Sequence, residues 1–552
     1  MNLPLPAVWK LRSSRRINRR TFRLLPALLA LALSGTCRGD VTLPSIISDN
    51  MVIQQREKLN LWGKADPGES VTVELGPESA QTTAGKDGSW SVKLGALKSG
   101  GPYNLAISGK NSITIQNVAV GEVWVCAGES NMAFKVIAAQ NGREEIADAS
   151  LPMVRVFMVK HTSADKPQAD CEGSWVVCNP DTVRNISAVG YFFAKELNQG
   201  MRVPFALIQC AWGPSPAEAW TPRETLEKDA TLHAVLDRYD KSAAAYPAAL
   251  SAYQGKLDDW KTASQAAKTA GSPPPHRPLP PLPPGGPREP AGIYNGMIYP
   301  LSRYPIRGAL WYQGESNTGD PALYRALFPA MIDAWRKQWD EGNFPFLYAQ
   351  LSGFLARHPQ PAESSWAQLR EAQAAALSLP KTGMAVTIDI GEDHNIHPPG
   401  KRDVGHRLAL LAQSEVYGKS SVTASGPAFS GMNIEDGKAI LSFTHTEGGL
   451  VAKNGSPLKG FSIAGPDRKF VWADAEIHAG KVIVQSKEVP KPVAVRYAWA
   501  DTPDCDLFNL AQLPAPPFRT DTWLPGQPES AASPSPTPGK SHGKGKHHAA
   551  AE

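Results

Sequence analysis

Cysteine is scarce in this chain, with six residues among 552. A disulfide scaffold needs a dense, even set of cysteines, and neither a Cys-x-x-Cys pair nor another zinc-ligand spacing occurs. The sequence therefore excludes a disulfide-stapled fold and a zinc-ribbon domain. Cys126 and Cys210 lie in apolar runs and are expected to be buried thiols. Cys171 and Cys178 are close enough in sequence for one local bridge.

Apolar runs long enough to cross a bilayer are also missing, so no integral membrane span is expected. The run LLPALLALAL follows seven basic residues and precedes small residues, which is the layout of a secretory leader over residues 1–39. Residues 18–22 resemble a twin-arginine export signal, so we expect export to the periplasm or beyond. The Gly-Thr pair before Cys37 fits a lipoprotein signal poorly, so no lipid anchor is expected there.

An excess of positive charge is absent once this leader is set aside. Of the 57 basic residues, eight lie in residues 1–39, which leaves 49 basic against 52 acidic residues. A nucleic-acid-binding role therefore lacks its main electrostatic support, and no nucleic-acid partner is expected.

Two kinds of strand pattern divide the rest of the chain. Short alternating runs in residues 40–119 predict an N-terminal β-sandwich, and those in 421–524 predict a C-terminal β-domain. In residues 120–420, continuous apolar runs alternate with helical stretches, which favours a parallel sheet covered on both faces. We therefore predict a three-layer α/β/α domain with a five-stranded parallel sheet. The five runs are 121–128, 204–213, 307–314, 344–351 and 384–390.

Two segments depart from these patterns. Residues 225–290 form an insertion, in which a polar, Ala-rich stretch predicts an exposed helical hairpin before an extended proline-rich segment. Residues 525–552 are rich in Ser, Pro, Gly, Lys and His and are expected to be disordered, because they cannot bury a core.

The tetrapeptide GESN occurs twice, at 128–131 and 314–317, each time after an apolar run of the predicted sheet. Parallel α/β sheets bind ligands at the carboxyl ends of their strands. Gly213 and the loop around His397 follow two further predicted strands. We therefore expect both motifs to contribute, in different ways, to one crevice.

Ser130 lies in a predicted strand-to-helix turn, where a hydroxyl and the backbone N–H groups face the same space. This placement suits a nucleophile whose oxyanion is held by its own amide, although a helix N-cap serine explains the position equally well. His397 lies in a loop closed by a Pro-Pro-Gly sequence, and it is either a general base or a structural residue. Because Ser130, His397 and Gly213 share one predicted crevice, we favour the catalytic interpretation.

Several neighbours are candidates for holding an oxyanion or a substrate. Gly213 leaves its N–H unobstructed, and the side-chain amides of Gln313 and Asn317 can donate hydrogen bonds. Ser316 is a weaker nucleophile candidate because no separate base is evident for it. Three more residues of the two motifs are expected to line the same crevice: Glu129, Asn131 and Glu315.

A family resemblance supports this interpretation. The segments VWVCAGESNM, AWGPSPAEAW, IYNGMIYPL, WYQGESN and DIGEDHNIHPPGKRDVGHRLA, in this order, resemble the sialate O-acetylesterase family of SGNH hydrolases. ISDNMVIQQ and VRYAWADTPDCDLFNLAQLPAPPFRTD extend the resemblance toward both ends. It implies an SGNH-type domain and hydrolysis of acetyl esters on sugars by a serine, without metal or cofactor. Ser130 takes the place of the nucleophile, Gly213 of the second oxyanion donor and His397 of the base.

The chain departs from the family pattern in two places. Glu129 stands where the family usually has Gln, so an extra carboxylate either turns away to a basic partner or slows acylation. The wider SGNH pattern has Asp three residues before the histidine, a position that His394 occupies here. Either Asp393 is the acid of a triad, or a backbone carbonyl orients the imidazole and a Ser–His dyad operates.

Two other hypotheses compete with an esterase. A non-catalytic carbohydrate-binding protein would account for the aromatic residues near the strand ends and for the irregular acid position. A metallohydrolase would use the histidines and acids of the last predicted strand-end loop and the helix after it. The candidate ligands are His394, His397 and His406 with Asp389 or Asp393.

Overall fold

The computed structural model describes residues 40–455 and 457–523. The predicted leader, with Cys37, and the predicted disordered tail lie outside the described residues. In the described part, no helix combines the length and apolar character that a bilayer crossing requires.

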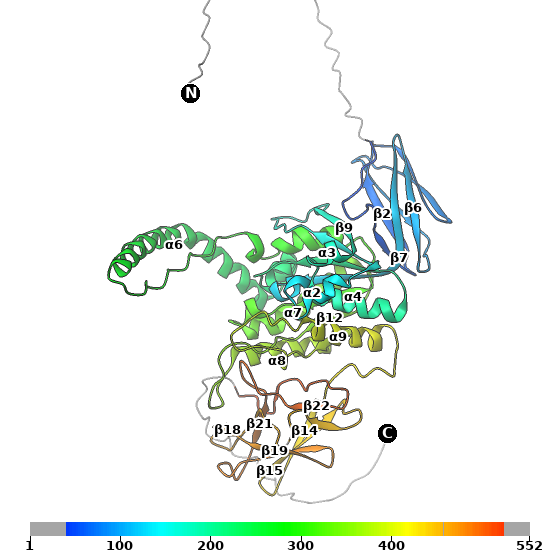
Figure 1. Ribbon diagram of the computed structural model, residues 1–552. Coiled ribbons are helices and arrows are strands. Elements are labelled where there is room, and N and C mark those ends of the chain that lie inside the picture. The colour runs from blue at the N-terminus through cyan, green and yellow to red at the C-terminus, as the bar shows by residue number, and fades with distance from the viewer. Residues whose placement is uncertain (1–39, 456, 524–552) are drawn as a thin grey trace, which may run out of the picture. The chain divides into compact units, whose positions relative to one another are not determined.

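Seven strands form the N-terminal β-structure, and the last of them continues into the central sheet (Figure 1). Residues along β5 alternate between exposed and buried, as expected for a sheet with one face on a core. β7 pairs first with β6 and then with β10 and β11. The boundary predicted after residue 119 stays a prediction, because β7 crosses it without a break. The strands are β1 (Val52–Gln54), β2 (Leu59–Lys64), β3 (Ser70–Leu75), β4 (Glu78–Thr83), β5 (Ser89–Leu94), β6 (Gly100–Ser108) and β7 (Ser112–Gly128).

The central sheet has the order β13-β12-β11-β7-β10-β8-β9 and contains four of the predicted strands, as parallel neighbours, at their predicted positions. The fifth was predicted too late in the sequence, because β13 ends at Ala385 and overlaps only the first two residues of the predicted run 384–390. The predicted number of strands was wrong, because β8 adds a sixth parallel strand and β9 an antiparallel edge. Arg155 interrupts the apolar pattern of β8, and its buried guanidinium donates to the carbonyls of Asn50 and Asn117. The strands are β8 (Leu151–Val159), β9 (Gly173–Cys178), β10 (Phe205–Ala211), β11 (Gly308–Tyr312), β12 (Phe346–Ala349) and β13 (Thr382–Ala385).

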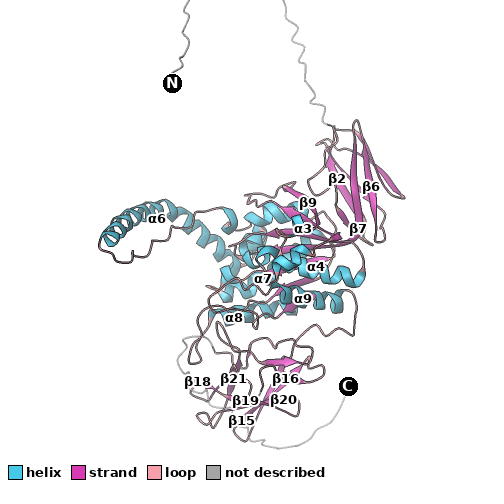
Figure 2. Ribbon diagram, viewed as in Figure 1, coloured by secondary structure: helices cyan, strands magenta, loops and turns pink. Residues whose placement is uncertain are grey.

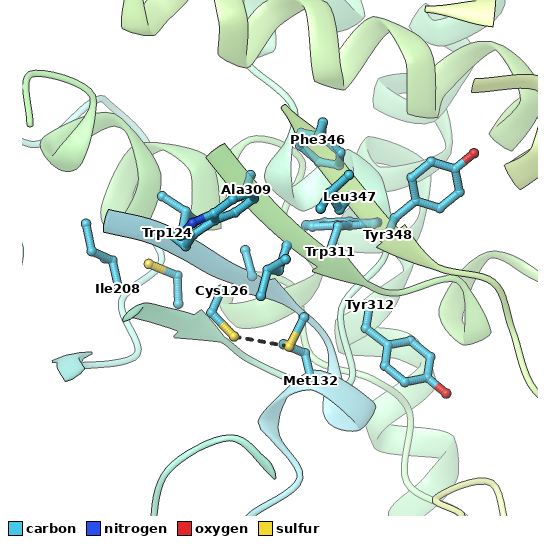
Figure 3. Close-up of a cluster of buried hydrophobic side chains, with 14 of the residues drawn as sticks. Trp124, Cys126, Met132, Ile208, Ala309, Trp311, Tyr312, Phe346, Leu347 and Tyr348 are labelled. Carbon is cyan, nitrogen blue, oxygen red and sulfur yellow. Dashed lines mark hydrogen bonds between the residues drawn. The ribbon is translucent and has the colours of Figure 1, made fainter. Parts of the chain in front are cut away.

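Helices cover both faces of this sheet (Figure 2). Trp124 pairs in register with Gly308, three residues before Trp311, so the two indoles point to opposite faces. Figure 3 shows both side chains among the buried residues of the central strands. Trp124 contacts Phe193 of α4, with 5.1 Å between ring centroids, and Trp311 contacts Trp335 of α7 at 5.9 Å. α4 packs against α9, and α7 packs against α8. These helices are α4 (Ala188–Met201), α7 (Pro321–Trp339), α8 (Ser365–Ala375) and α9 (Lys401–Leu411). Shorter helices are α1 (Ser130–Ala133), α2 (Gly142–Ala147), α3 (Pro180–Val183) and α5 (Arg223–Lys228).

The insertion contains one long helix, α6 (Ala230–Thr269), where the sequence predicted a helical hairpin (Figure 1). The proline-rich segment returns along α6 as extended chain, as the sequence predicted, because proline lacks the N–H group that a helix needs. The Trp260 indole donates to the Pro275 carbonyl at 2.8 Å, and the Gly285 amide donates to the Tyr239 hydroxyl at 2.8 Å.

Antiparallel sheets make up the C-terminal region, as the alternating sequence pattern predicted. One four-stranded sheet consists of β14 (Ala428–Glu435), β15 (Lys438–Thr444), β19 (Asp474–His478) and β20 (Lys481–Gln485). The other consists of β17 (Phe461–Ala464), β18 (Phe470–Trp472), β21 (Ala494–Tyr497) and β23 (Phe518–Arg519), and β16 (Leu450–Ala452) pairs with β22 (Leu507–Asn509). Arg370 of α8 is fully buried and donates to the carbonyls of Ala500 and Asp501, which connects this region to the helices.

The cysteines within the described residues are all free thiols. Cys126 and Cys210 have no exposed surface, which confirms the prediction that they are buried. Cys171 and Cys178 are buried as free thiols and do not form the local bridge that their spacing allowed. Burial raises the pKa of each of these two thiols to about 12.

Candidate active site

A serine and a histidine meet at the carboxyl end of the central sheet. β7 ends at Gly128, and Ser130 is the first residue of α1. Gly128 has φ of +137°, and a Cβ atom there would lie 2.2 Å from the Tyr312 carbonyl oxygen, so the turn requires glycine. This turn presents Ser130 as a half-buried side chain. Its Oγ atom lies 2.8 Å from Nε2 of His397.

The loop that carries His397 is fixed by its own sequence. The His397 amide donates to Oδ1 of Asn395 at 3.0 Å, and prolines follow at 398 and 399. Burial and the positive charge of Lys401 lower the pKa of the His397 imidazole, and the negative charge of Glu129 opposes this shift. The neutral imidazole is therefore favoured, and its Nε2 atom can accept the hydrogen of the Ser130 hydroxyl.

Asp393, the predicted acid, does not lie beside His397. Its Oδ1 atom is 3.7 Å from Nε2 of the exposed His394. Asp389 is bound to another residue, because it accepts two hydrogen bonds from Arg407, at 2.6 and 2.7 Å. Across residues 40–455 and 457–523, no carboxylate forms an ion pair or hydrogen bond with His397. The missing carboxylate agrees with the dyad alternative, but within the same residues no backbone carbonyl accepts a hydrogen bond from the His397 ring, so the orienting carbonyl of that alternative is not found.

Gly213 lies directly against the serine. A Cβ atom at Gly213 would come within 2.4 Å of the backbone nitrogen of Ser130, so only glycine allows this approach. Among the described residues, no acceptor takes the N–H group of Gly213. The N–H of Ser130 belongs to the first turn of α1 and has no partner within that helix. Two backbone donors are thus available next to the Ser130 hydroxyl.

The structure does not bring the amides of Gln313 and Asn317 to the serine. Nε2 of the fully buried Gln313 donates to Asn317 at 2.7 Å and to the Ser215 carbonyl at 3.2 Å. Nδ2 of Asn317 donates to Glu218 at 2.9 Å. Because both amides are engaged in this way, they support the loop after Gly213 and are not free to stabilise an oxyanion.

The two GESN motifs are interlocked by their glutamates. Glu129 turns away from Ser130 and accepts hydrogen bonds from the Gly314 and Ser316 amides, at 2.9 and 3.2 Å. The Ser316 hydroxyl also donates to Glu129, at 2.6 Å. Glu129 therefore turns away, as one of the two alternatives stated, but its partner is the second motif and not a basic residue. Ser316 faces a carboxylate and not a histidine.

Asn131 and Glu315 lie in a buried polar cluster that also contains Lys401. Nδ2 of Asn131 donates to Oε1 of Glu315 at 2.5 Å, and Nζ of Lys401 donates to Oδ1 of Asn131 at 2.6 Å. Burial and the Glu129 carboxylate raise the pKa of Glu315 well above its ordinary range. Sequence reasoning missed Lys401, although it directly follows the loop that carries His397.

One of the aromatic residues expected at the strand ends, Trp212, adjoins Gly213 and pairs with a histidine that sequence reasoning did not single out. Trp212 is half-buried and stacks on the exposed ring of His161, with 4.7 Å between ring centroids. His161 follows β8, so this pair also lies at the carboxyl edge of the sheet.

The ligands of the hypothetical metal site are dispersed. Nδ1 of His406 lies 2.8 Å from Glu196, and Asp389 is bound to Arg407. In the part of the chain that the structure describes, no three His, Cys, Asp or Glu side chains are arranged to hold a metal ion. The geometry therefore gives the metallohydrolase hypothesis no support.

Several known proteins are similar to this chain in sequence. A family model described as carbohydrate esterase, sialic acid-specific acetylesterase, matches residues 292–414. Sialate O-acetylesterase of Rattus norvegicus is 28% identical over 520 residues, which cover 85% of this chain and 92% of the rat protein. The Homo sapiens enzyme of that name is 27% identical over 524 residues, covering 86% of this chain and 91% of its own.

A solved structure is similar to most of this chain. The crystal structure of a carbohydrate acetylesterase from Xanthomonas citri aligns with a TM-score of 0.75 and 35% identity. The alignment covers 88% of this chain and 100% of that one. All these relatives are described as esterases, which does not support a non-catalytic sugar-binding protein. The chain belongs to the sialate O-acetylesterase family of carbohydrate esterases, a family of acetyl ester hydrolases.

Proposed function

We propose that this chain is an exported serine esterase that removes O-acetyl groups from sugars through an acyl-enzyme intermediate. The 2.8 Å contact between Ser130 Oγ and His397 Nε2 carries the proposal, because a nucleophile needs a base within hydrogen-bonding reach. The names of the relatives support an acetylated carbohydrate as substrate. Export rests on the leader-like sequence of residues 1–39.

In the acylation step, Ser130 Oγ forms a bond to the acetyl carbonyl carbon while its proton passes to Nε2 of His397. The carbonyl oxygen becomes an oxyanion, and the N–H groups of Ser130 and Gly213 donate to it. The tetrahedral intermediate collapses when the bond to the sugar oxygen breaks. His397 returns the proton to that oxygen, which leaves acetyl-Ser130 and a free sugar hydroxyl.

Deacylation repeats these proton transfers with water in place of Ser130 as the nucleophile. His397 takes a proton from water, and the resulting hydroxide forms a bond to the acetyl carbon. The bond to Ser130 Oγ then breaks, and the proton on His397 passes to that oxygen. Acetic acid leaves and loses its proton to the solvent to become acetate, and the serine has regained its hydrogen. The same two backbone donors stabilise the second oxyanion.

The proposed catalytic pair is a dyad, so the Asp393→Asn variant is expected to change kcat/KM by less than about threefold. Substitutions away from specific contacts typically stay within about 0.5 kcal/mol, and Asp393 contacts only the exposed His394 among the described residues. Steady-state acetate release measures this. A hundredfold loss with intact folding would show that Asp393 acts as the acid of a triad.

The acidic limb of the pH profile is expected to lie below the ordinary imidazole pKa of 6.5, because the pKa of His397 is lowered. A protonated His397 cannot accept the Ser130 proton, so activity falls as the pH drops through that pKa. A lowered pKa delays the loss to more acidic pH. The measurement is kcat/KM against pH with an acetyl ester that does not ionise in this range. An inflection above 6.5 would contradict the proposed state of His397.

Covalent capture together with substrate screening tests the proposed function. The purified full-length chain is incubated with defined O-acetylated sugars and polysaccharides in the presence of a strong chelator, and free acetate is measured. We expect acetate release together with stoichiometric labelling of Ser130 by a fluorophosphonate, located by peptide mass spectrometry. Sugar binding without acetate release by a folded sample would overturn the proposal in favour of the carbohydrate-binding alternative.

A further inference from the structure

One asparagine side chain connects the backbone next to the serine with the backbone next to the histidine. We propose that Asn131, held in place by the buried Lys401, is a positioning residue that keeps the His397 loop against Ser130, a task that the acid performs in a catalytic triad. This inference rests on the proposed function, because it concerns how the same pair is oriented.

Asn131 directly follows Ser130 and has no exposed surface. Its Nδ2 atom donates to the carbonyl oxygen of Ile396 at 2.9 Å, and Ile396 directly precedes His397. The segments that carry nucleophile and base are 265 residues apart at this contact and are joined by one short side chain. In a triad, an acid fixes the imidazole through its second ring nitrogen. Here the loop is fixed through its backbone.

Both ends of the Asn131 amide are occupied, so the side chain cannot rotate without breaking several hydrogen bonds. Oδ1 accepts from Nζ of Lys401 at 2.6 Å, and Nδ2 donates to Glu315 at 2.5 Å as well as to Ile396. Lys401 is fully buried and is the first residue of α9, directly after the His397 loop. The loop is therefore held at Ile396 by Asn131 and at its end by Lys401.

Lys401 also sets the charge near the imidazole. Its ammonium group lies over the rings of Phe134 and Tyr312, 4.9 and 5.4 Å from their centroids. The charged groups that face it are Glu315 from the second GESN motif, Glu392 from the histidine loop, and His397 itself. Burial lowers the pKa of Lys401 to about 7, although these two carboxylates raise it. Lys401 is therefore charged in the acidic range where His397 titrates.

The two contributions of Lys401 predict two separable effects. Lys401→Met removes the support of Asn131 and the charge, so kcat/KM should fall about 10- to 100-fold, as expected for a misplaced catalytic pair. Its acidic limb should also move to higher pH, because the charge that lowers the pKa of His397 is gone. Asn131→Ala should lose activity to a similar extent and keep the acidic limb of the wild type. Lys401→Gln retains a hydrogen-bond donor near Asn131. Its acidic limb should move as in Lys401→Met, but its loss of kcat/KM should be smaller.

Arg402→Met is the matched control. Arg402 follows Lys401 on the same helix and carries the same charge, but its guanidinium bonds to Glu145 and does not contact Asn131. It should leave both the rate and the pH profile unchanged. Circular dichroism and thermal unfolding establish that each variant is folded, and the rate of fluorophosphonate labelling of Ser130 reports on the pair independently of acetate release.

Wild-type kcat/KM and labelling rate in folded Lys401→Met and Asn131→Ala would overturn the inference. The inference would also be overturned if Lys401→Met and Lys401→Gln both lost activity while the acidic limb of the pH profile stayed in place. A lysine with a purely structural role would give that result. If the wild type itself releases no acetate from any acetyl ester, the proposed function fails and not merely this inference. The wild-type and Ser130→Ala samples, measured beside the variants, distinguish the two cases.

Discussion

Ser130→Ala is expected to lower kcat for acetate release by about 10,000-fold or more, the scale seen when a catalytic nucleophile is removed. The Ser130 hydroxyl contacts His397 and lies next to the free backbone donors of Ser130 and Gly213. Without it no acyl-enzyme forms, and the remaining donors stabilise only direct attack by water. Folding should be nearly unaffected, because one half-buried hydrogen bond contributes about 0.5–1.5 kcal/mol. Acetate release and thermal unfolding, measured on the same samples, check both expectations.

The second GESN motif offers a matched control in Ser316→Ala. The Ser316 hydroxyl donates to Glu129, so its loss leaves a buried carboxylate with two amide donors. We expect a stability loss of about 1–3 kcal/mol with kcat within about tenfold of the wild type. Loss of labelling in Ser316→Ala with retention in Ser130→Ala would reverse the assignment of the two serines.

The parts of the fold that the sequence predicted are those with an uninterrupted local pattern. Four of the predicted strands are continuous apolar runs that end in glycine or polar residues, and each is present in the sheet, whereas β13 overlaps only the start of the fifth run. β8 escaped notice because Arg155 breaks its pattern, and the carbonyls that satisfy this guanidinium come from a distant part of the chain. The helical hairpin predicted in the insertion was wrong, because residues 230–269 continue as one helix, and the extended proline-rich segment that was predicted after it packs on α6 in place of a second helix.

The residues of the site also divide into those that a sequence pattern predicts and those that it does not. Ser130, Gly213 and His397 follow strands, so the rule that parallel strands end at a common edge predicts that they lie together. The partners of Glu129, Asn131 and Gln313 follow from no such rule. Glu129 reaches amides about 185 residues away, and no spacing within the sequence indicates that choice. The sequence leaves open whether an acid contacts His397, and within the described residues Asp393 lies beside His394 instead.

His397→Ala is expected to lower kcat by about 1,000-fold or more, because the imidazole serves as base in one step and as acid in the next. The acidic limb assigned to His397 should disappear from the pH profile of the residual activity. The control is His394→Ala, three residues earlier in the same loop, whose side chain is 85% exposed and contacts only Asp393 among the described residues. It should retain wild-type kinetics. A similar loss of kcat in both variants would indicate that activity depends on the conformation of the loop and not on the imidazole of His397.

The double variant Ser130→Ala with His397→Ala tests whether the two residues act as a unit. A serine without its base is a poor nucleophile, and a base without its serine can activate only water, so either single substitution removes most of what the pair provides. The double variant should therefore be no slower than Ser130→Ala by more than a few-fold. If the loss of activity in the double variant equalled the product of the two single losses, serine and histidine would contribute independently. That result would be incompatible with proton transfer across the 2.8 Å contact on which the proposed mechanism depends.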